Sequence, residues 1–301
     1  MKSVCLFLAV LCLLMVTPGC DDTTSSALIP PKLRMTIEAS HLTPLQNGYN
    51  YKAWAKVGDT YLGTELFNVT STGQFTTSIG QFRDKSFVLE DDATDAEIVL
   101  ISIEGKIGNA ERPSGTVVLA GDVSGVSSTL TTAHPSALGS WLVSQSGKLT
   151  IMTPSDTDLT NESHGVWFLT VSGSTQTPGL SLPALSSGWE YEGWVEVGGS
   201  VLSTGRFTSN TGNDSNAYSF PDVPLFPGED FFVNPPDGIT FPLNLDGATV
   251  SITAEPFPDD TIEPSGMKVL SAKLPPVATG GTVIDLTGTD TGFPSATISI
   301  F

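Results

Sequence analysis

Positive charge is scarce in this 301-residue chain, which has 13 lysine and arginine residues against 32 aspartate and glutamate residues and a formal net charge of −19. Proteins that bind nucleic acid gather lysine and arginine into a basic patch, and the sequence contains no such cluster. We therefore expect no nucleic-acid partner. A negative field of this size also disfavours contact with an anionic bilayer face.

Cysteines and long apolar segments are also few. The apolar run of residues 4–16, which follows Lys2, is too short to span a bilayer as a helix and is typical of a secretory signal. The Gly-Cys pair that ends at Cys20 resembles the end of a bacterial lipobox, where the signal is removed before a cysteine that carries lipid. Cys5 and Cys12 leave with such a signal, so we expect no disulfide in the mature chain.

The sequence before Cys20 departs from the usual lipobox at Thr17 and Pro18, so ordinary signal cleavage stays the alternative. Residues 20–32 are mostly small and polar and predict a flexible tether after a signal peptide of residues 1–19. We expect an exported protein of the bacterial cell envelope that is anchored to a membrane through lipid on Cys20 and faces the periplasm or the cell surface.

Histidine is rare as well. None of His41, His134 and His164 has a two-histidine metal spacing or belongs to a recognisable serine-histidine-aspartate motif. No glycine-rich phosphate loop leads from a strand into a helix. We therefore predict a protein that is not an enzyme and has no cofactor.

The chain does contain two long internal matches. Residues 45–67 match residues 185–207 with nine identities at a constant offset of 140, and residues 98–121 match residues 249–272 at an offset of 151. The change of offset gives the second stretch 11 extra residues, which we place within residues 209–247. Such self-similarity indicates an internal duplication.

Both stretches predict β structure. Residues 189–197 alternate with a period of two, with glutamates and Trp194 on one face and Tyr191 and valines on the other. Many short apolar runs follow, separated by some of the 30 glycines and 21 prolines. We predict an all-β fold of two tandem antiparallel β-sandwich modules of the immunoglobulin-like type. Their expected bounds are residues 33–137 and 166–301, and residues 138–165 connect them as strands of either module.

The order of motifs is the same in both stretches. Gly-x-x-Tyr-x-x-Trp comes first, then a hairpin ending near Gly-x-Phe, a strand ending in Glu, and Pro-Ser-Gly before Val-Leu. Over residues 33–122 and 166–274 this order is similar to the extracytoplasmic C-terminal domain of anti-sigma-K factors, and the chain resembles a group of bacterial envelope proteins with that domain. The resemblance implies an outer, sensing-type module used twice. The cytoplasmic helical domain and membrane-spanning helix of those factors have no counterpart here, so we expect no direct sigma-factor partner.

The repeated aromatic pairs, Tyr51 with Trp54 and Tyr191 with Trp194, are the candidate binding residues. On a regular strand a spacing of three turns the two rings to opposite faces, which leaves the tryptophan outside, where it binds a sugar, a cation or another module. The alternative that we favour is a bulge at Ala53 and Gly193 that turns both rings into the core.

Carboxylates give two weaker candidates. Glu104 and Glu255 recur before Pro-Ser-Gly, where we favour a structural role, accepting backbone N–H groups, over a role as a catalytic acid. A weak calcium candidate gathers oxygen ligands but lacks the glycine and the final glutamate of the twelve-residue calcium loop. It consists of Asp156, Asp158, Asn161 and Glu162.

The hypothesis that joins these features is a non-enzymatic, lipid-anchored envelope protein whose two modules bind or sense an envelope component, either a protein or a glycan. The alternative is a secreted or surface protein that binds carbohydrate or, less plausibly, cleaves it, suggested by Trp141, Trp167, Trp189 and Trp194 and by the many carboxylates. A calcium-stabilised spacer is the third interpretation.

Overall fold

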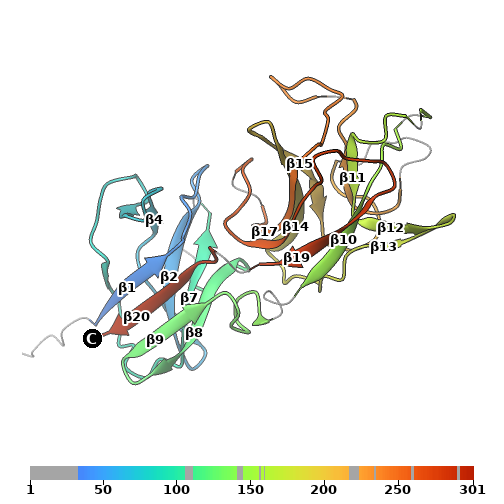
Figure 1. Ribbon diagram of the computed structural model, residues 1–301. Helices are drawn as coiled ribbons and strands as arrows, with labels where there is room; N and C mark the ends of the chain where they lie inside the picture. The colour runs from blue at the N-terminus through green and yellow to red at the C-terminus, as the bar shows by residue number, and fades with distance from the viewer. Residues whose placement is uncertain are drawn as a thin grey trace, which may run out of the picture. The chain divides into compact units, whose positions relative to one another are not determined.

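The computed structural model describes residues 33–105, 111–140, 145–155, 157–158, 160–216, 224–233, 235–258, 261–289 and 292–301 (Figure 1). Contacts divide the chain into Met1–Pro31 and Lys32–Phe301, and every described residue belongs to the second unit. The expected signal peptide, the lipid site Cys20 and the whole expected tether lie outside the described residues. Within these ranges no helix has the length and apolar character needed to cross a membrane.

The first large sheet has ten strands. Along the sheet they run in the order β5-β4-β2-β7-β8-β9-β20-β1-β6, and β3 pairs with β2 beside β4. Their bounds are β1 (Arg34–Ser40), β2 (Asn50–Val57), β3 (Thr60–Gly63), β4 (Phe67–Val69), β5 (Phe75–Thr77), β6 (Ser86–Val88), β7 (Ile98–Glu104), β8 (Val117–Ser124), β9 (Ser127–Thr131) and β20 (Ser295–Ile300).

The two ends of this sheet approach each other, so that it nearly closes into a barrel. Phe82, just after β5, forms an isolated bridge with Thr76, and Arg83 N donates a 3.1 Å hydrogen bond to Phe75 O. Inside, the Phe67 ring lies 5.2 Å from Phe75 and 5.1 Å from Phe87, measured between centroids. This aromatic contact joins strands from both ends of the sheet and fills the interior.

The second large sheet has eight strands in the order β15-β14-β17-β18-β19-β10-β11-β16, and a separate two-stranded ribbon pairs β12 with β13. Every described strand pair is antiparallel, so the predicted all-β class is confirmed. The bounds are β10 (Ser146–Ile151), β11 (Gly165–Trp167), β12 (Leu169–Ser172), β13 (Thr175–Pro178), β14 (Trp189–Val197), β15 (Ser200–Phe207), β16 (Gly228–Asp230), β17 (Thr249–Pro256), β18 (Lys268–Lys273) and β19 (Val283–Gly288).

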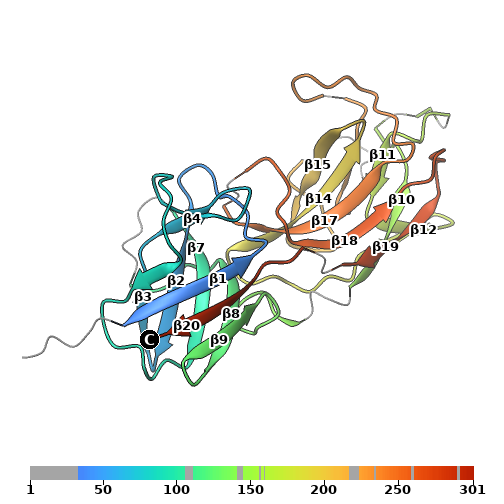
Figure 2. The same cartoon turned by 60° about the vertical axis from the view of Figure 1, so that its left-hand side comes forward.

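One strand, β20, pairs outside the module in which we expected it. We placed residues 166–301 together, but β20 pairs with β1 and β9 of the ten-stranded sheet, and Figures 1 and 2 show the red β20 beside the blue β1. β20 buries Ala296, Ile298 and Ile300, and it occupies edges of β1 and β9 that would otherwise be left unpaired. Within residues 138–165, β10 and β11 both lie in the eight-stranded sheet.

Candidate binding groove

The four aromatic candidates are buried, and the two rings of each pair point to opposite faces of their strand. Tyr51 and Tyr191 pack in the main core, whereas Trp54 forms a separate small cluster with Leu100, Ala120 and Ala137. Trp54 is 1% exposed and Trp194 is 3% exposed, so the burial of both tryptophans that we favoured is found, and the exposed alternative is wrong. Other parts of the protein therefore cover the outer face of each sheet at the position of the indole ring.

The bulge interpretation is also corrected. Where β14 pairs with β15 the register shifts by one residue between Gly193 and Trp194, and the same shift occurs beside β2, where Tyr51 faces Phe67 and Trp54 faces Gly63. The extra residue lies on the partner strand in both cases, so the two rings of each pair still point to opposite faces. Trp194 Nε1 donates a 2.8 Å hydrogen bond to Thr253 Oγ1, and Trp54 Nε1 donates one of 2.9 Å to Ser102 Oγ. Because each buried N–H has a partner, these indoles contribute to the stability of their sheets.

The recurring glutamates have the structural role that we favoured. Glu104 Oε1 accepts a 2.9 Å hydrogen bond from Ser114 N, and Glu255 Oε1 accepts one of the same length from Ser265 N. Both side chains are buried. Each carboxylate thus holds the Pro-Ser-Gly turn that follows it in sequence against the end of its strand.

The weak calcium candidate is described only in part. Asp156 lies outside the described residues, and the described ranges contain no group of three or more histidine, cysteine, aspartate or glutamate residues able to hold a metal ion. Asp158 Oδ1 accepts hydrogen bonds from Thr160 N and Oγ1, which lower the pKa of Asp158. Glu162 Oε2 accepts a 2.8 Å hydrogen bond from Thr153 N. Asn161, the fourth candidate, contributes its backbone oxygen to the Thr153 hydroxyl.

A large groove lies over the outer face of β2 and β3 in the ten-stranded sheet, and we call it the Trp54 groove. It has a volume of about 1000 Å³. Its lining comes from residues 52–54, 59–66, 77–78, 88–90 and 111–112. Five separate segments therefore build one site.

The floor of the groove is an ammonium group on an indole. Lys52 Nζ lies 4.0 Å from the centroid of the Trp54 ring, and the ring of Tyr61 meets Trp54 edge-on at 6.4 Å. Burial lowers the pKa of Lys52, while the charges of Glu104 and Glu90 act in the opposite direction. The lysine stem fits only because residue 63 is glycine, since a Cβ there would lie 2.4 Å from Lys52 Cε.

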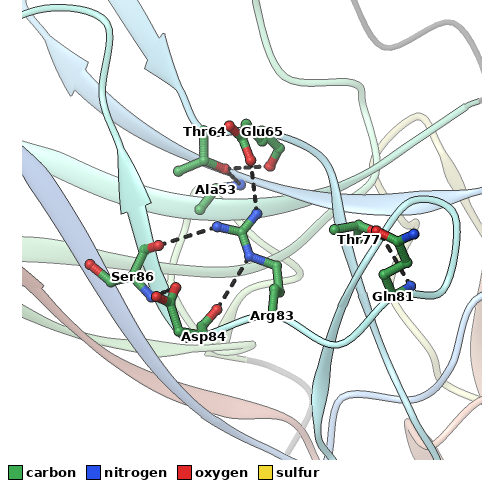
Figure 3. A network of polar contacts seen from close by, with 8 residues as sticks. All are labelled: Ala53, Thr64, Glu65, Thr77, Gln81, Arg83, Asp84 and Ser86. Atoms are coloured by element: carbon green, nitrogen blue, oxygen red, sulfur yellow. Dashed lines mark hydrogen bonds and ion pairs between the residues drawn. The ribbon is translucent and has the colours of Figure 1, made fainter.

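Figure 3 shows Arg83 between Glu65, which lines the groove, and Ser86. Arg83 Nη1 donates a 3.1 Å hydrogen bond to Glu65 Oε2, and Nη2 donates one of 3.2 Å to Ser86 O. Its guanidinium carbon also lies 3.7 Å from the centroid of the Phe87 ring. The arginine therefore ties the segment after β3 to the segment before β6, which gives the groove a fixed wall.

Carboxylates outnumber cations along the lining. The described lining contains two basic residues, Lys52 and Arg112. It contains four acidic residues: Asp59, Glu65, Glu90 and Glu111. Only Glu65 of these acids has an ion pair within the described ranges, with Arg83. The groove can therefore attract positively charged groups.

The corresponding place in the eight-stranded sheet is filled. At the 140-residue offset, Lys52 and Gly63 correspond to Glu192 and Ser203, and Ser203 Oγ donates a 2.5 Å hydrogen bond to Glu192 Oε1. The cavity beside Ser203 measures only about 140 Å³ and is lined partly by Asn216, Glu229 and Phe231. Residues from the region of the extra segment therefore occupy the space that is open over β3.

Glu229 in this smaller cavity is an unusual carboxyl group. It is 8% exposed. Burial, and then the charges of Asp230 and Asp214, raise the pKa of Glu229 to about 8. The group is thus largely protonated at neutral pH, which lets it lie among carboxylates without a compensating cation.

Sequence reasoning singled out Trp54 but missed the groove around it. The period-two pattern does place Lys52 on the same face as Trp54, so that signal was present. Glu90, Thr77 and Arg112 are distant in sequence and reach the groove only through the near closure of the sheet. No local pattern marks them as neighbours.

Searches of family models, of curated proteins and of solved structures each return no match to this chain.

Proposed function

We propose that this chain is a non-enzymatic protein of the bacterial cell envelope, anchored through lipid on Cys20, that binds or senses another envelope component with its extracytoplasmic β modules. The observation that carries the binding role is the Trp54 groove, which has a volume of about 1000 Å³ and a wall held by Arg83. This volume lies at the upper end of the range of ligand-binding clefts, about 300–1,000 Å³.

The proposal includes an internal duplication of a module similar to the C-terminal domain of anti-sigma-K factors. Equivalent contacts at matched positions support it. The hydroxyls of Tyr51 and Tyr191 each donate a 2.8 Å hydrogen bond to a backbone oxygen eight residues earlier, at Thr43 and Pro183. The indole and glutamate hydrogen bonds described above also recur in both sheets.

Carbohydrate binding is the alternative, and burial removes most of its original motivation. Trp54, Trp167, Trp189 and Trp194 are all buried, whereas stacking on a sugar needs an accessible ring face. Trp141 lies outside the described residues. Tyr61 is the half-buried aromatic ring in the Trp54 groove and is the remaining described platform there.

Two measurements test the proposal. The intact mass of the protein from its native membrane fraction should correspond to a chain that begins at lipidated Cys20, and Cys20→Ala should abolish that mass. The unlipidated Cys20→Ala chain should also co-sediment with isolated envelope fragments. Adding Tyr61→Ala should reduce this binding, while Glu196→Gln, on the exposed face of β14, serves as the control. An unlipidated native chain without affinity for envelope fragments would refute the proposal.

A further inference from the structure

The groove contains an open strand edge. Within the described part of the chain, β3 pairs with β2 and with no other strand. Thr64 N donates a 2.9 Å hydrogen bond to Ala53 O. Because the backbone groups of successive strand residues point alternately to the two sides, those of Leu62, two residues before Thr64, also point toward β2. The N–H and C=O groups of Tyr61 and Gly63 therefore point away from β2. Both residues line the Trp54 groove.

The equivalent edge of the eight-stranded sheet is already covered by the chain itself. β15 pairs with β14 on one side. On its other side Ser215 N donates a 2.9 Å hydrogen bond to Arg206 O, and Arg206 N donates one of 2.8 Å to Ser215 Oγ. Asn216 Nδ2 also contacts Ser203 O at 3.5 Å. The covering residues lie in the region that carries the extra segment.

At the 140-residue offset, Ser203 and Arg206 correspond to Gly63 and Leu66, which both line the Trp54 groove. In the eight-stranded sheet, a segment of the chain itself thus covers the outer edge of β15. In the ten-stranded sheet, the equivalent edge of β3 is open beside the Trp54 groove. An unpaired edge with N–H and C=O groups exposed is a template for another strand.

The charges beside this edge define what side chains the added segment should have. Asp59, Glu90 and Glu111 are exposed carboxylates of the groove with no ion pair among the described residues. Apolar contact is offered by Tyr61 and by Val88, which is 37% exposed. Since side chains alternate along an extended segment, one set can reach the carboxylates while the other packs on the apolar wall.

We propose that the Trp54 groove binds an extended, lysine- or arginine-bearing peptide segment of a partner protein, which pairs with the outer edge of β3 as an added strand. This inference rests on the proposed function and specifies its ligand. Main-chain hydrogen bonds to Tyr61 and Gly63 hold the segment, and the carboxylates select its basic side chains.

The test uses the full Cys20→Ala chain and labelled peptides followed by fluorescence anisotropy. The probe is a peptide of alternating lysine and valine, and its counterpart replaces every lysine by glutamate. We expect the lysine peptide to bind at least about tenfold more tightly in low salt, and this difference to shrink at roughly 0.5 M salt. Glu90→Gln should weaken binding several-fold, and Glu196→Gln should leave it unchanged.

Backbone pairing is tested separately by N-methylation. In a strand the N–H groups of alternate residues point in opposite directions, so methylating every lysine nitrogen and methylating every valine nitrogen block opposite edges. We expect one of the two methylated peptides to lose binding and the other to keep it. Equal binding by both methylated peptides would overturn strand addition.

The remaining outcomes separate this inference from the proposed function. Envelope fragments can bind through the groove, so that Tyr61→Ala weakens their binding, and yet be displaced by chitin oligosaccharides and not by the lysine peptide. That result refutes the peptide ligand and leaves the envelope role standing. If sedimentation velocity shows concentration-dependent dimers that the lysine peptide dissolves, the occupant is a second copy of this chain and the partner is refuted. If envelope fragments do not bind at all, both proposals fail.

Discussion

The indole nitrogen of Trp54 on β2 donates a 2.9 Å hydrogen bond to the hydroxyl of Ser102 on β7, the neighbouring strand. Ser102 in turn donates to Glu104 Oε1, which also accepts the hydrogen bond from Ser114 N. A chain of three hydrogen bonds therefore runs from the floor of the groove to the Pro-Ser-Gly turn. Each member is buried or half-buried, so breaking the chain leaves polar groups without compensation.

The first prediction concerns this chain of hydrogen bonds. Glu104→Ala removes the acceptor for Ser102 and Ser114 and should lower the free energy of unfolding by about 2–4 kcal/mol. Chemical denaturation measures the change. The control is Glu97→Ala, which removes an exposed glutamate 3.6 Å from Lys56 and should change stability by less than about 0.5 kcal/mol. Equal effects of the two variants would contradict the structural role of Glu104.

The second prediction concerns the floor of the groove. Gly63→Ala places a Cβ 2.4 Å from Lys52 Cε, so the flexible lysine must leave its place over Trp54. Burial lowers the pKa of Lys52 at present, and the pKa should rise when the ammonium moves into water. An NMR titration of the lysine side chains measures this shift. An unchanged Lys52 pKa in the variant would show that the lysine is not held as described.

The third prediction follows from the raised pKa of Glu229, about 8 in the folded chain against an ordinary value of 4.5. Between these values the unfolded chain releases this proton while the folded chain keeps it, so stability falls as pH rises from about 4.5 to 8. Glu229→Gln removes this contribution. The melting temperature of the native protein should therefore drop between pH 5 and pH 8 by roughly 5 °C more than that of the variant.

Thermal unfolding followed by circular dichroism at both pH values checks this difference. Glu196→Gln changes an exposed glutamate in the same sheet and should keep the pH dependence of the native protein. If Glu229→Gln and Glu196→Gln show the same pH dependence, Glu229 does not keep its proton in the folded chain.

The fourth prediction compares two glycines of the eight-stranded sheet and its turns. Gly205 has φ +113°, and a Cβ there would lie 2.4 Å from Asp214 Cγ, whereas Gly199 has φ +83° and nothing within 4 Å. Gly199→Ala should cost only backbone strain of about 1 kcal/mol. Gly205→Ala also displaces the segment that covers β15, and should cost about 3 kcal/mol or more. Denaturation curves of the two variants, compared at equal pH, give the difference.

Much of the local structure could be predicted from the sequence, because strand alternation is a short-range signal. Within residues 189–197 the assigned inner face holds, since Tyr191 and Val195 are buried in the core. The assigned outer face is exposed at Glu196, whereas Glu192 on the same face is buried. The structural role of Glu104 and Glu255 followed from their recurrence before the same turn. These inferences needed only neighbours within about ten residues.

Long-range pairing could not be predicted in the same way. Nothing in residues 295–300 indicates that they pair with residues 35–40 rather than with a nearer strand. The burial of Trp54 depends on Ala137 and Lys52, which cover an outer face that periodicity alone marks as exposed. The open edge of β3 depends equally on the absence of a covering strand, which is a property of the whole sheet.

The position of β20 also has a consequence for how the protein reaches its native state. β20 lies between β9 and β1, yet the eight strands of the other large sheet all precede it in the chain. As the chain is synthesised, the first sheet begins to form but cannot join β9 to β1 until the other strands have followed. Its folding is therefore of high contact order and comes late, and the unpaired edges of β1 and β9 need protection from aggregation until then.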